Sequence, residues 1–123
     1  MDRNELEKYN VGENLDALMT LDPRGYGVCR ILYAGSRART GAPLTMAAAE
    51  ALCRELKEND PVFILTGFVL LPHKVPEMDG MVSSMLLCRA LVLAFNAKPI
   101  IICPEDSLEA IEKCANVVGL HIY

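Results

Sequence analysis

Two short apolar runs, at residues 62–65 (VFIL) and 100–103 (IIIC), constrain the fold most strongly. Turn-forming residues bound each run, and an almost uninterrupted apolar segment lies between them at residues 80–95. Runs of this length and composition are typical of strands that are buried on both faces. Parallel strands need a long crossover connection, and residues 80–95 are long enough to supply it as a helix. The pattern therefore predicts a β-α-β unit with a right-handed crossover.

The predicted unit continues after the second run. A helical pattern follows it, with Asp106 and Glu109 at the spacing of a capping box and Gly119 as the stop. Residues 120–123 then begin a third strand. Residues 60–123 thus predict the βαβαβ core of a three-layer, Rossmann-like α/β fold, a parallel sheet with helices on both faces. Because three strands make a small parallel sheet, we expect it to be incomplete in this chain or completed by another chain.

The first half of the chain is less clearly patterned. Residues 1–13 are polar, and we expect them to be flexible or peripheral. The apolar stretch at 26–34 favours a helix over a strand, the small and basic residues at 35–43 favour a loop, and 46–59 favour another helix. A length of 123 residues predicts one α/β domain over 1–123.

Composition excludes several classes of protein. The chain is 52% hydrophobic and 23% charged, which is typical of a globular domain, and its formal net charge of −4 argues against a nucleic-acid partner. The most apolar stretch, residues 81–95, is short for a membrane span and contains Arg89, so it predicts a helix buried on several sides. The amino terminus lacks the pattern of a secretory signal, which favours a cytoplasmic location and leaves an organellar address open.

The cysteines predict neither a disulfide framework nor a zinc site. The chain has five, an odd number, and no two of them form a CxxC motif. We expect reduced and mostly buried thiols. No cofactor is predicted, and use of a divalent metal stays open.

Candidate site residues gather in the loop after the first strand, because ligands bind at the carboxyl ends of parallel strands. Thr66 offers a hydroxyl, Gly67 allows close approach to the backbone, and Phe68 follows them. Asp79 and Gly80 stand at the predicted helix start, whose free N–H groups suit an anion. Gly67 is equally consistent with a plain turn, and Asp79 with an ordinary N-cap.

Further candidates carry charge. His73 lies in the same loop and could act as a general base, while Glu77 and Asp79 could divide acid and base roles or bind a metal. Arg37 and Arg39 could hold substrate carboxylates. Each of these is also explained by a solvated loop side chain. From its residues alone, the chain is predicted to be an α/β domain with an anion-friendly loop.

The strand ending in LTGF, at residues 65–68, and the loop ending in PEMDG, at residues 76–80, resemble the D-glutamate cyclase-like family. Segments upstream agree, including NLD at 14–16, LYA at 32–34 and the alanine-rich stretch at 43–49. The resemblance extends from about residue 14 to the end. It is similar to the amino-terminal part of the family's cyclase domain.

The resemblance implies a lyase that converts D-glutamate to 5-oxo-D-proline and water. It points to Asp79 as base or amine anchor, and to the N–H groups of Gly67 and Gly80 as oxyanion donors. A small carboxylate or amino acid is then the expected substrate, and a homo-oligomer or a partner chain would complete the sheet. Two alternatives stay open: a non-catalytic α/β module that binds a small carboxylate or nucleotide, and an interaction subunit whose sheet edge pairs with another chain.

Overall fold

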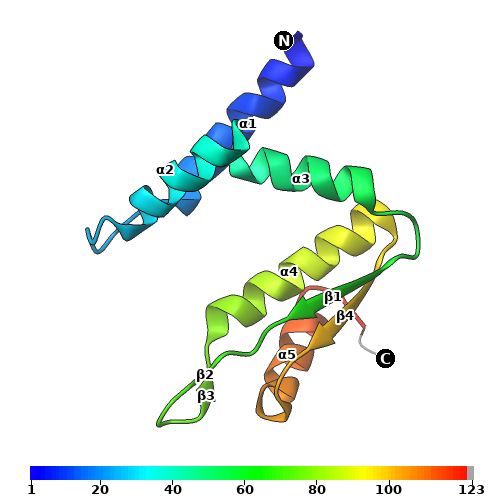
Figure 1. Cartoon of the computed structure of the whole chain (residues 1–123). Helices are drawn as coiled ribbons and strands as arrows, with labels where there is room; N and C mark the ends of the chain where they lie inside the picture. The colour runs from blue at the N-terminus through cyan, green and yellow to red at the C-terminus, as the bar shows by residue number, and fades with distance from the viewer. Residues whose placement is uncertain (122–123) are drawn as a thin grey trace. The chain divides into compact units, whose positions relative to one another are not determined.

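The computed structural model describes residues 1–121, and residues 122–123 lie outside the described part. The chain divides into two compact units, Met1–Glu55 and Leu56–Tyr123. The first is helical, whereas the second holds the strands (Figure 1). The described residues therefore form a mixed α/β protein with five helices and a small parallel sheet of two strands.

Three helices make up the first unit: α1 (Arg3–Met19), α2 (Val28–Thr40) and α3 (Leu44–Glu55). A capping box starts α1, in which the Glu5 N–H donates to Asp2 Oδ1 and the Asp2 N–H donates to Glu5 Oε2, each at 2.8 Å. These bonds satisfy backbone donors that a helix start otherwise leaves free. Residues 3–13, in the stretch expected to be flexible or peripheral, are helical and mostly exposed.

The helix predicted at residues 26–34 is confirmed as α2, but it continues to Thr40 through residues that were predicted as a loop. Its second half is held against α1 by one side chain. Arg37 donates to the Tyr9 hydroxyl at 2.6 Å, lies over the Tyr9 ring at 5.5 Å from the centroid, and pairs with Glu13. Local composition could not reveal this extension, because its stabilising partners come from another helix.

Asp16 connects all three helices of the first unit. Its side chain is buried, with 2% exposure, and its carboxylate accepts from the Leu44 N–H at 2.6 Å and the Thr45 N–H at 2.9 Å. The Thr45 and Tyr33 hydroxyls also donate to it, at 2.7 and 3.0 Å. Asp16 of α1 thus supplies the N-terminal cap of α3 and fixes α2 through Tyr33.

This arrangement predicts a specific sensitivity to acid. Burial alone would raise the pKa of the Asp16 carboxyl, but the hydrogen bonds, led by that of the Thr45 side chain, outweigh it and lower the pKa from 3.8 to about 2. A depressed folded-state pKa stabilises the protein above the unfolded pKa, so this stabilisation is lost as pH falls from about 4 through about 2. We expect it to be worth about 1–2 kcal/mol, measured as the unfolding free energy at each pH.

The matched variant for this measurement is Asp16→Asn, which cannot titrate. Its unfolding free energy should be lower than that of the parent at pH 6, and the gap should narrow towards pH 2. A gap that is constant with pH would contradict the role given to the Asp16 charge.

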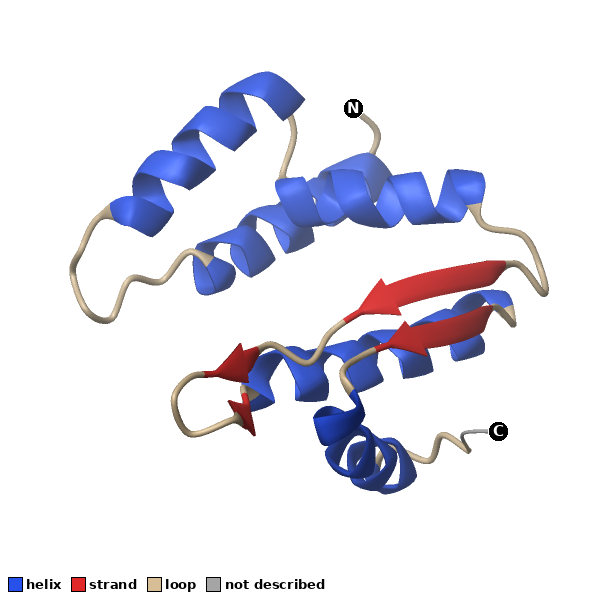
Figure 2. Ribbon diagram, turned by 60° about the horizontal axis from the view of Figure 1, so that its bottom comes forward, coloured by secondary structure: helices blue, strands red, loops and turns tan. Residues whose placement is uncertain are grey.

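The second unit contains β1 (Pro61–Leu65), β2 (Val69–Leu70), β3 (Val75–Pro76), α4 (Met78–Phe95), β4 (Lys98–Ile102) and α5 (Glu105–Val117). β1 and β4 pair in parallel with Phe63 opposite Ile100, and α4 is the crossover between them (Figure 2). The predicted β-α-β unit and its following helix are therefore confirmed. A short antiparallel pairing of β2 with β3 interrupts the loop after β1 and was not predicted.

The core of the second unit lies between one face of the sheet and both helices. α4 buries a single stripe of Met81, Met85, Cys88 and Leu91, at the spacing of one helix face. Burial of four such side chains contributes on the order of 6–10 kcal/mol. Other apolar positions of α4 are exposed, Leu93 by 71%, so the expected burial on several sides is wrong for the described residues.

α4 also satisfies a purely compositional test for membrane spans. Its 18 residues are long and apolar enough to cross a bilayer, and it is the one such helix among residues 1–121. The same length and composition are found in core helices of globular domains. In this structure Met81, Met85 and Cys88 pack with Ile111 and Ala115 of α5, and 22% of the helix is buried.

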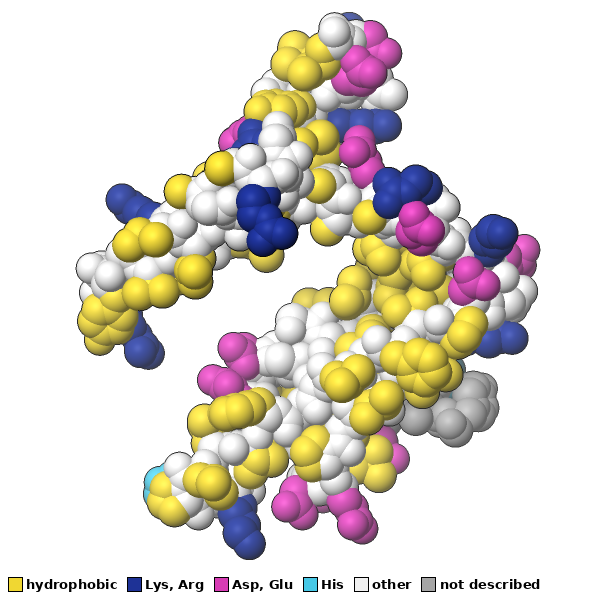
Figure 3. Space-filling model, viewed as in Figure 1, with side chains coloured by type: hydrophobic (Ala, Val, Ile, Leu, Met, Phe, Trp, Pro, Cys, Tyr) yellow, Lys and Arg dark blue, Asp and Glu magenta, His cyan; other side chains and the backbone are white. Residues whose placement is uncertain are grey.

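The other face of the sheet has no helix of this unit over it. Phe63, Leu65, Ile100 and Ile102 point to this face and are 41–75% exposed, and hydrophobic side chains lie over the strands in Figure 3. The predicted three-layer arrangement, with helices on both faces, is therefore not shown within this unit. The third strand predicted at residues 120–123 is absent at 120–121, and its remainder lies outside the described residues.

The two strands share a feature at their outer edges, where neither can donate a hydrogen bond from its first outward-facing residue. The Lys98 N–H donates to the Asp60 carbonyl at 2.8 Å, and the Thr66 N–H donates to the Ile102 carbonyl at 3.0 Å. Because backbone groups alternate in direction along a strand, Pro61 of β1 and Pro99 of β4 face outward. Each outer edge thus begins with a residue that has no N–H to donate.

Candidate active site at the carboxyl edge of the sheet

The turn after β1 lies tightly against the start of α5. Gly67 has a φ of +93°, and a Cβ added to it would stand 2.8 Å from Pro104 Cδ and 3.0 Å from Ser107 Oγ. Both its conformation and its surroundings therefore require glycine. Gly67 therefore does more than form a turn, because its lack of a side chain also lets the loop backbone approach the start of α5.

The start of α4 touches the neighbouring residue of the same turn. A Cβ on Gly80 would lie 3.4 Å from the Thr66 hydroxyl oxygen, an ordinary contact distance. The prediction of Asp79 as N-cap is wrong: Glu77 holds that position with extended backbone, and Asp79 lies in the first turn. Asp79 Oδ1 accepts from the Gly80 N–H at 2.6 Å, so its carboxylate stays at the positive end of the helix.

The start of α5 contains a buried hydroxyl. Pro104 is the N-cap and offers no side-chain bond, so the capping box predicted for Asp106 and Glu109 is wrong, and Glu109 accepts from Lys113 at 2.6 Å instead. Ser107 has 0% exposure, and its Oγ has no hydrogen-bond partner among the described residues. Such a group costs about 1–3 kcal/mol in stability, which makes its presence here unusual.

Two helix N-termini thus meet at the Thr66–Gly67 turn. Neither α4 nor α5 has a side-chain cap, whereas Asp2 and Asp16 cap the first and third helices of the chain. Uncapped N–H groups and the helix dipoles attract negative charge. The carboxyl edge of this small parallel sheet therefore combines two anion-favouring helix starts with a hydroxyl, a glycine backbone and the Asp79 carboxylate.

The other predicted site residues lie farther along the loop or in the first unit. His73 belongs to the turn between β2 and β3, Glu77 directly precedes α4, and Phe68 is 70% exposed beside β2. Arg39 and Arg37 are in α2, where Arg37 is already paired with Glu13. Thr66, Gly67, Asp79 and Gly80 are therefore the candidates that the structure brings together.

Sequence reasoning missed Ser107. It stands 40 positions after Gly67 in the chain, and the motif around it was interpreted as a capping box. One available signal was its place just after the second strand, because the carboxyl ends of parallel strands lie side by side. The same rule that selected Thr66 and Gly67 would have selected the first turn of the next helix.

The possible metal ligands do not cluster among the described residues, and the cysteines are spread over both units. Among residues 1–121, no group of three or more His, Cys, Asp or Glu side chains is placed to hold a metal ion. All five cysteines are free; Cys88 is buried, which raises its pKa, but Cys29 and Cys53 are exposed, against the expectation of mostly buried thiols. Their positions in α2 and α3 explain this, because neither helix contains a fully buried residue.

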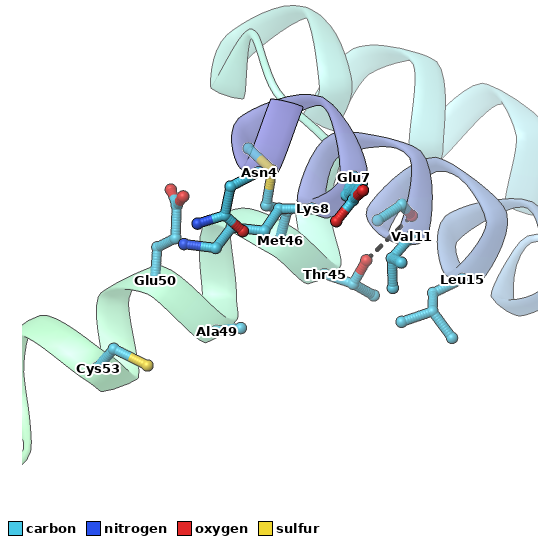
Figure 4. Close-up of a pocket in the computed structure, with 11 residues that line it drawn as sticks. Asn4, Glu7, Lys8, Val11, Leu15, Thr45, Met46, Ala49, Glu50 and Cys53 are labelled. Atoms are coloured by element: carbon cyan, nitrogen blue, oxygen red, sulfur yellow. Dashed lines mark hydrogen bonds between the residues drawn. The ribbon is translucent and has the colours of Figure 1, made fainter. Parts of the chain in front are cut away.

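A separate groove of about 500 Å³ lies in the first unit between α1 and α3 (Figure 4). Its walls are mainly apolar, and Glu7, Lys8 and Glu50 are the charged residues among those that line it. The Thr45 hydroxyl donates to the Gly12 carbonyl at 3.2 Å across the helix contact. None of the lining residues was predicted as a site residue, and they are Asn4, Glu7, Lys8, Val11, Gly12, Leu15, Thr45, Met46, Ala49, Glu50 and Cys53.

Comparison with known families agrees with the motifs at the carboxyl edge. The family model described as "D-glutamate cyclase-like, C-terminal" matches residues 15–123. The chain belongs to this family. The match covers residues 15–55 of the first unit, all of the second unit and every residue of the carboxyl-edge site, so the resemblance first suggested by LTGF and PEMDG is confirmed. Searches of the curated proteins and of the solved structures found no match.

Proposed function

We propose that this D-glutamate cyclase-like protein closes D-glutamate to 5-oxo-D-proline with loss of water. The observation that carries the proposal is the meeting of two uncapped helix starts at the Thr66–Gly67 turn, in a chain of this family. A dicarboxylate substrate suits a site with two positive helix ends. The proposed substrate class is therefore a small amino acid with two carboxylates.

The reaction sets definite requirements. The α-ammonium group must lose a proton before its nitrogen can attack the γ-carboxyl carbon. A carboxylate is a poor electrophile, so its negative charge must be neutralised, and one of its oxygens must leave as water. The new N–C bond and the departing water balance the overall conversion. The site therefore needs a general base, a proton donor and N–H groups directed at the developing oxyanion.

The carboxyl edge offers groups for each requirement. We assign Asp79 as the base that binds the substrate amine, since its carboxylate is exposed at the start of α4. In the described structure the Gly80 N–H donates to the Asp79 carboxylate. A substrate oxygen that takes the place of this carboxylate would accept from the Gly80 N–H and would leave Asp79 free to bind the substrate amine. The Gly67 and Gly80 N–H groups are the proposed oxyanion donors. His73 and Glu77, on the adjoining loop, are the proposed sources of the proton that leaves with water.

The direct test is an NMR time course of the purified chain with D-glutamate and, separately, with L-glutamate. We expect 5-oxoproline to form from the D form above the slow uncatalysed background. Equal rates for both forms, at the level of the background, would overturn the proposal. Divalent metal added to one sample and chelator to another would show whether turnover depends on a metal.

The exposed sheet face supports a second candidate, an interaction subunit. Parallel sheets are normally covered on both faces, yet four large apolar side chains of β1 and β4 are exposed. A cavity of about 680 Å³ also runs along β4 between α4 and α5, with mainly apolar walls that include Cys88, Ile101 and Ile111. Sedimentation distinguishes this candidate: self-association would favour it, whereas a monomer that turns over D-glutamate would exclude it as the sole function.

A further inference from the structure

Ser107 is the one buried polar side chain atom without a hydrogen-bond partner among residues 1–121. It lies at the start of α5, beside the Gly67 turn. Ser107 is the third residue of α5, and its Oγ points to the place that a Gly67 side chain would occupy, 3.0 Å away. An unsatisfied hydroxyl is thus held between a helix N-terminus and the turn that carries the proposed oxyanion donor.

The backbone around Ser107 is also unsatisfied. The Ser107 N–H donates to the Pro104 carbonyl at 3.0 Å, but no hydrogen bond of the described residues uses the N–H groups of Glu105 or Asp106. Pro104, as N-cap, has no side-chain acceptor to offer them. The first turn of α5 therefore presents two free N–H donors and one free hydroxyl, a set that matches a carboxylate with its two oxygens.

We propose that the first turn of α5 is a carboxylate-binding subsite in which the Ser107 hydroxyl donates to the ligand. This inference rests on the proposed function, because D-glutamate has a second carboxylate beyond the one that reacts at α4. The α5 subsite then holds the α-carboxylate, and the γ-carboxyl group is left at the start of α4. Ser107 thereby fixes which end of the substrate faces the Gly80 N–H.

Two features of the subsite bear on binding. The Glu105 and Asp106 carboxylates lie in the same first turn, but both side chains are exposed and can point into solvent. Ser107 is buried beside the Gly67 turn, so a ligand reaches its Oγ only when that turn moves outward. The subsite accordingly predicts that ligand binding changes the environment of the Thr66–Gly67 backbone.

The experiment compares the parent chain with Ser107→Ala, using glutarate as the probe. Glutarate has both carboxylates of glutamate but no amine, so it binds without reacting. We expect Ser107→Ala to raise the Kd for glutarate about tenfold while the free energy of unfolding stays equal or increases, because an unsatisfied hydroxyl has been removed. Ser107→Cys keeps the shape with a weaker donor and should fall between the two.

Ser36→Ala makes the same chemical change at an exposed position of α2 and should leave the Kd unchanged. A parent Kd retained in both Ser107 variants would overturn the inference, as would a parent that shows no saturable glutarate binding. Turnover of D-glutamate separates the two proposals. If the chain turns over D-glutamate but glutarate binding does not depend on Ser107, only the subsite proposal is contradicted. If glutarate binding depends on Ser107 but D-glutamate is not turned over, only the proposed lyase activity is contradicted.

Discussion

Replacement of Gly67 by alanine is expected to destabilise the second unit by about 2–4 kcal/mol. The new Cβ would stand 2.8 Å from Pro104 Cδ, an atom of a rigid ring, and the φ of +93° is unfavourable for any residue with a side chain. Relief requires the turn to separate from α5. Urea unfolding followed by circular dichroism measures the loss, and amide hydrogen exchange in β1 and α5 localises it.

Two other glycines separate the causes of this effect. Gly41 has a φ of +73° with nothing within 4 Å of an added Cβ, so Gly41→Ala isolates the cost of the backbone conformation, about 1 kcal/mol. Gly35 lies inside α2 with open space around it, and Gly35→Ala should stabilise by up to about 1 kcal/mol. If Gly67→Ala and Gly41→Ala lower the free energy of unfolding equally, the close packing of Gly67 on Pro104 and Ser107 adds nothing to the cost of the Gly67 substitution.

Asp79→Asn is expected to reduce turnover of D-glutamate by at least about 10²-fold, the usual contribution of a general base. Asparagine keeps an oxygen for the Gly80 N–H but cannot accept the proton of the substrate amine. The fold should persist, because Asp79 is exposed and its charge at the helix start contributes only about 0.3–1 kcal/mol. The initial rate of 5-oxoproline formation at saturating D-glutamate is the measurement.

Glu109→Gln is the matched control, since it neutralises an exposed acid of α5 whose partner is Lys113 on the same helix. Its turnover should equal that of the parent. If Asp79→Asn retains the parent rate while the parent is active, Asp79 has no part in the proton transfer, and Glu77 becomes the next carboxylate to replace.

Patterns that depend on neighbours in sequence predicted the second unit well. The branched residues of β1 and β4 and the long apolar α4 fix a β-α-β crossover locally, and the parallel register agrees. The extent of burial could not be predicted in the same way, because it depends on which elements cover each face. The apolar residues of α4 predicted burial on several sides of the helix, yet the rest of the second unit covers only one stripe of it.

The candidate site shows the same division. Thr66, Gly67 and Gly80 were predicted because strand ends and helix starts are visible in the sequence, and the structure places them together. Arg37 was chosen for its charge alone, and its pairing with Glu13 comes from a different helix. For Ser107 the sequence offers only its place after the second strand, since only the folded chain shows that its hydroxyl lacks a partner.

The two outward-facing prolines affect how the sheet can grow. Pro61 and Pro99 each remove a donor from the amino end of an outer edge, so a strand added beside β1 or β4 can form its full ladder only over the opposite half. That half ends at the Thr66–Gly67 turn. Any chain that extends this sheet would therefore be registered towards the carboxyl edge, beside the candidate site.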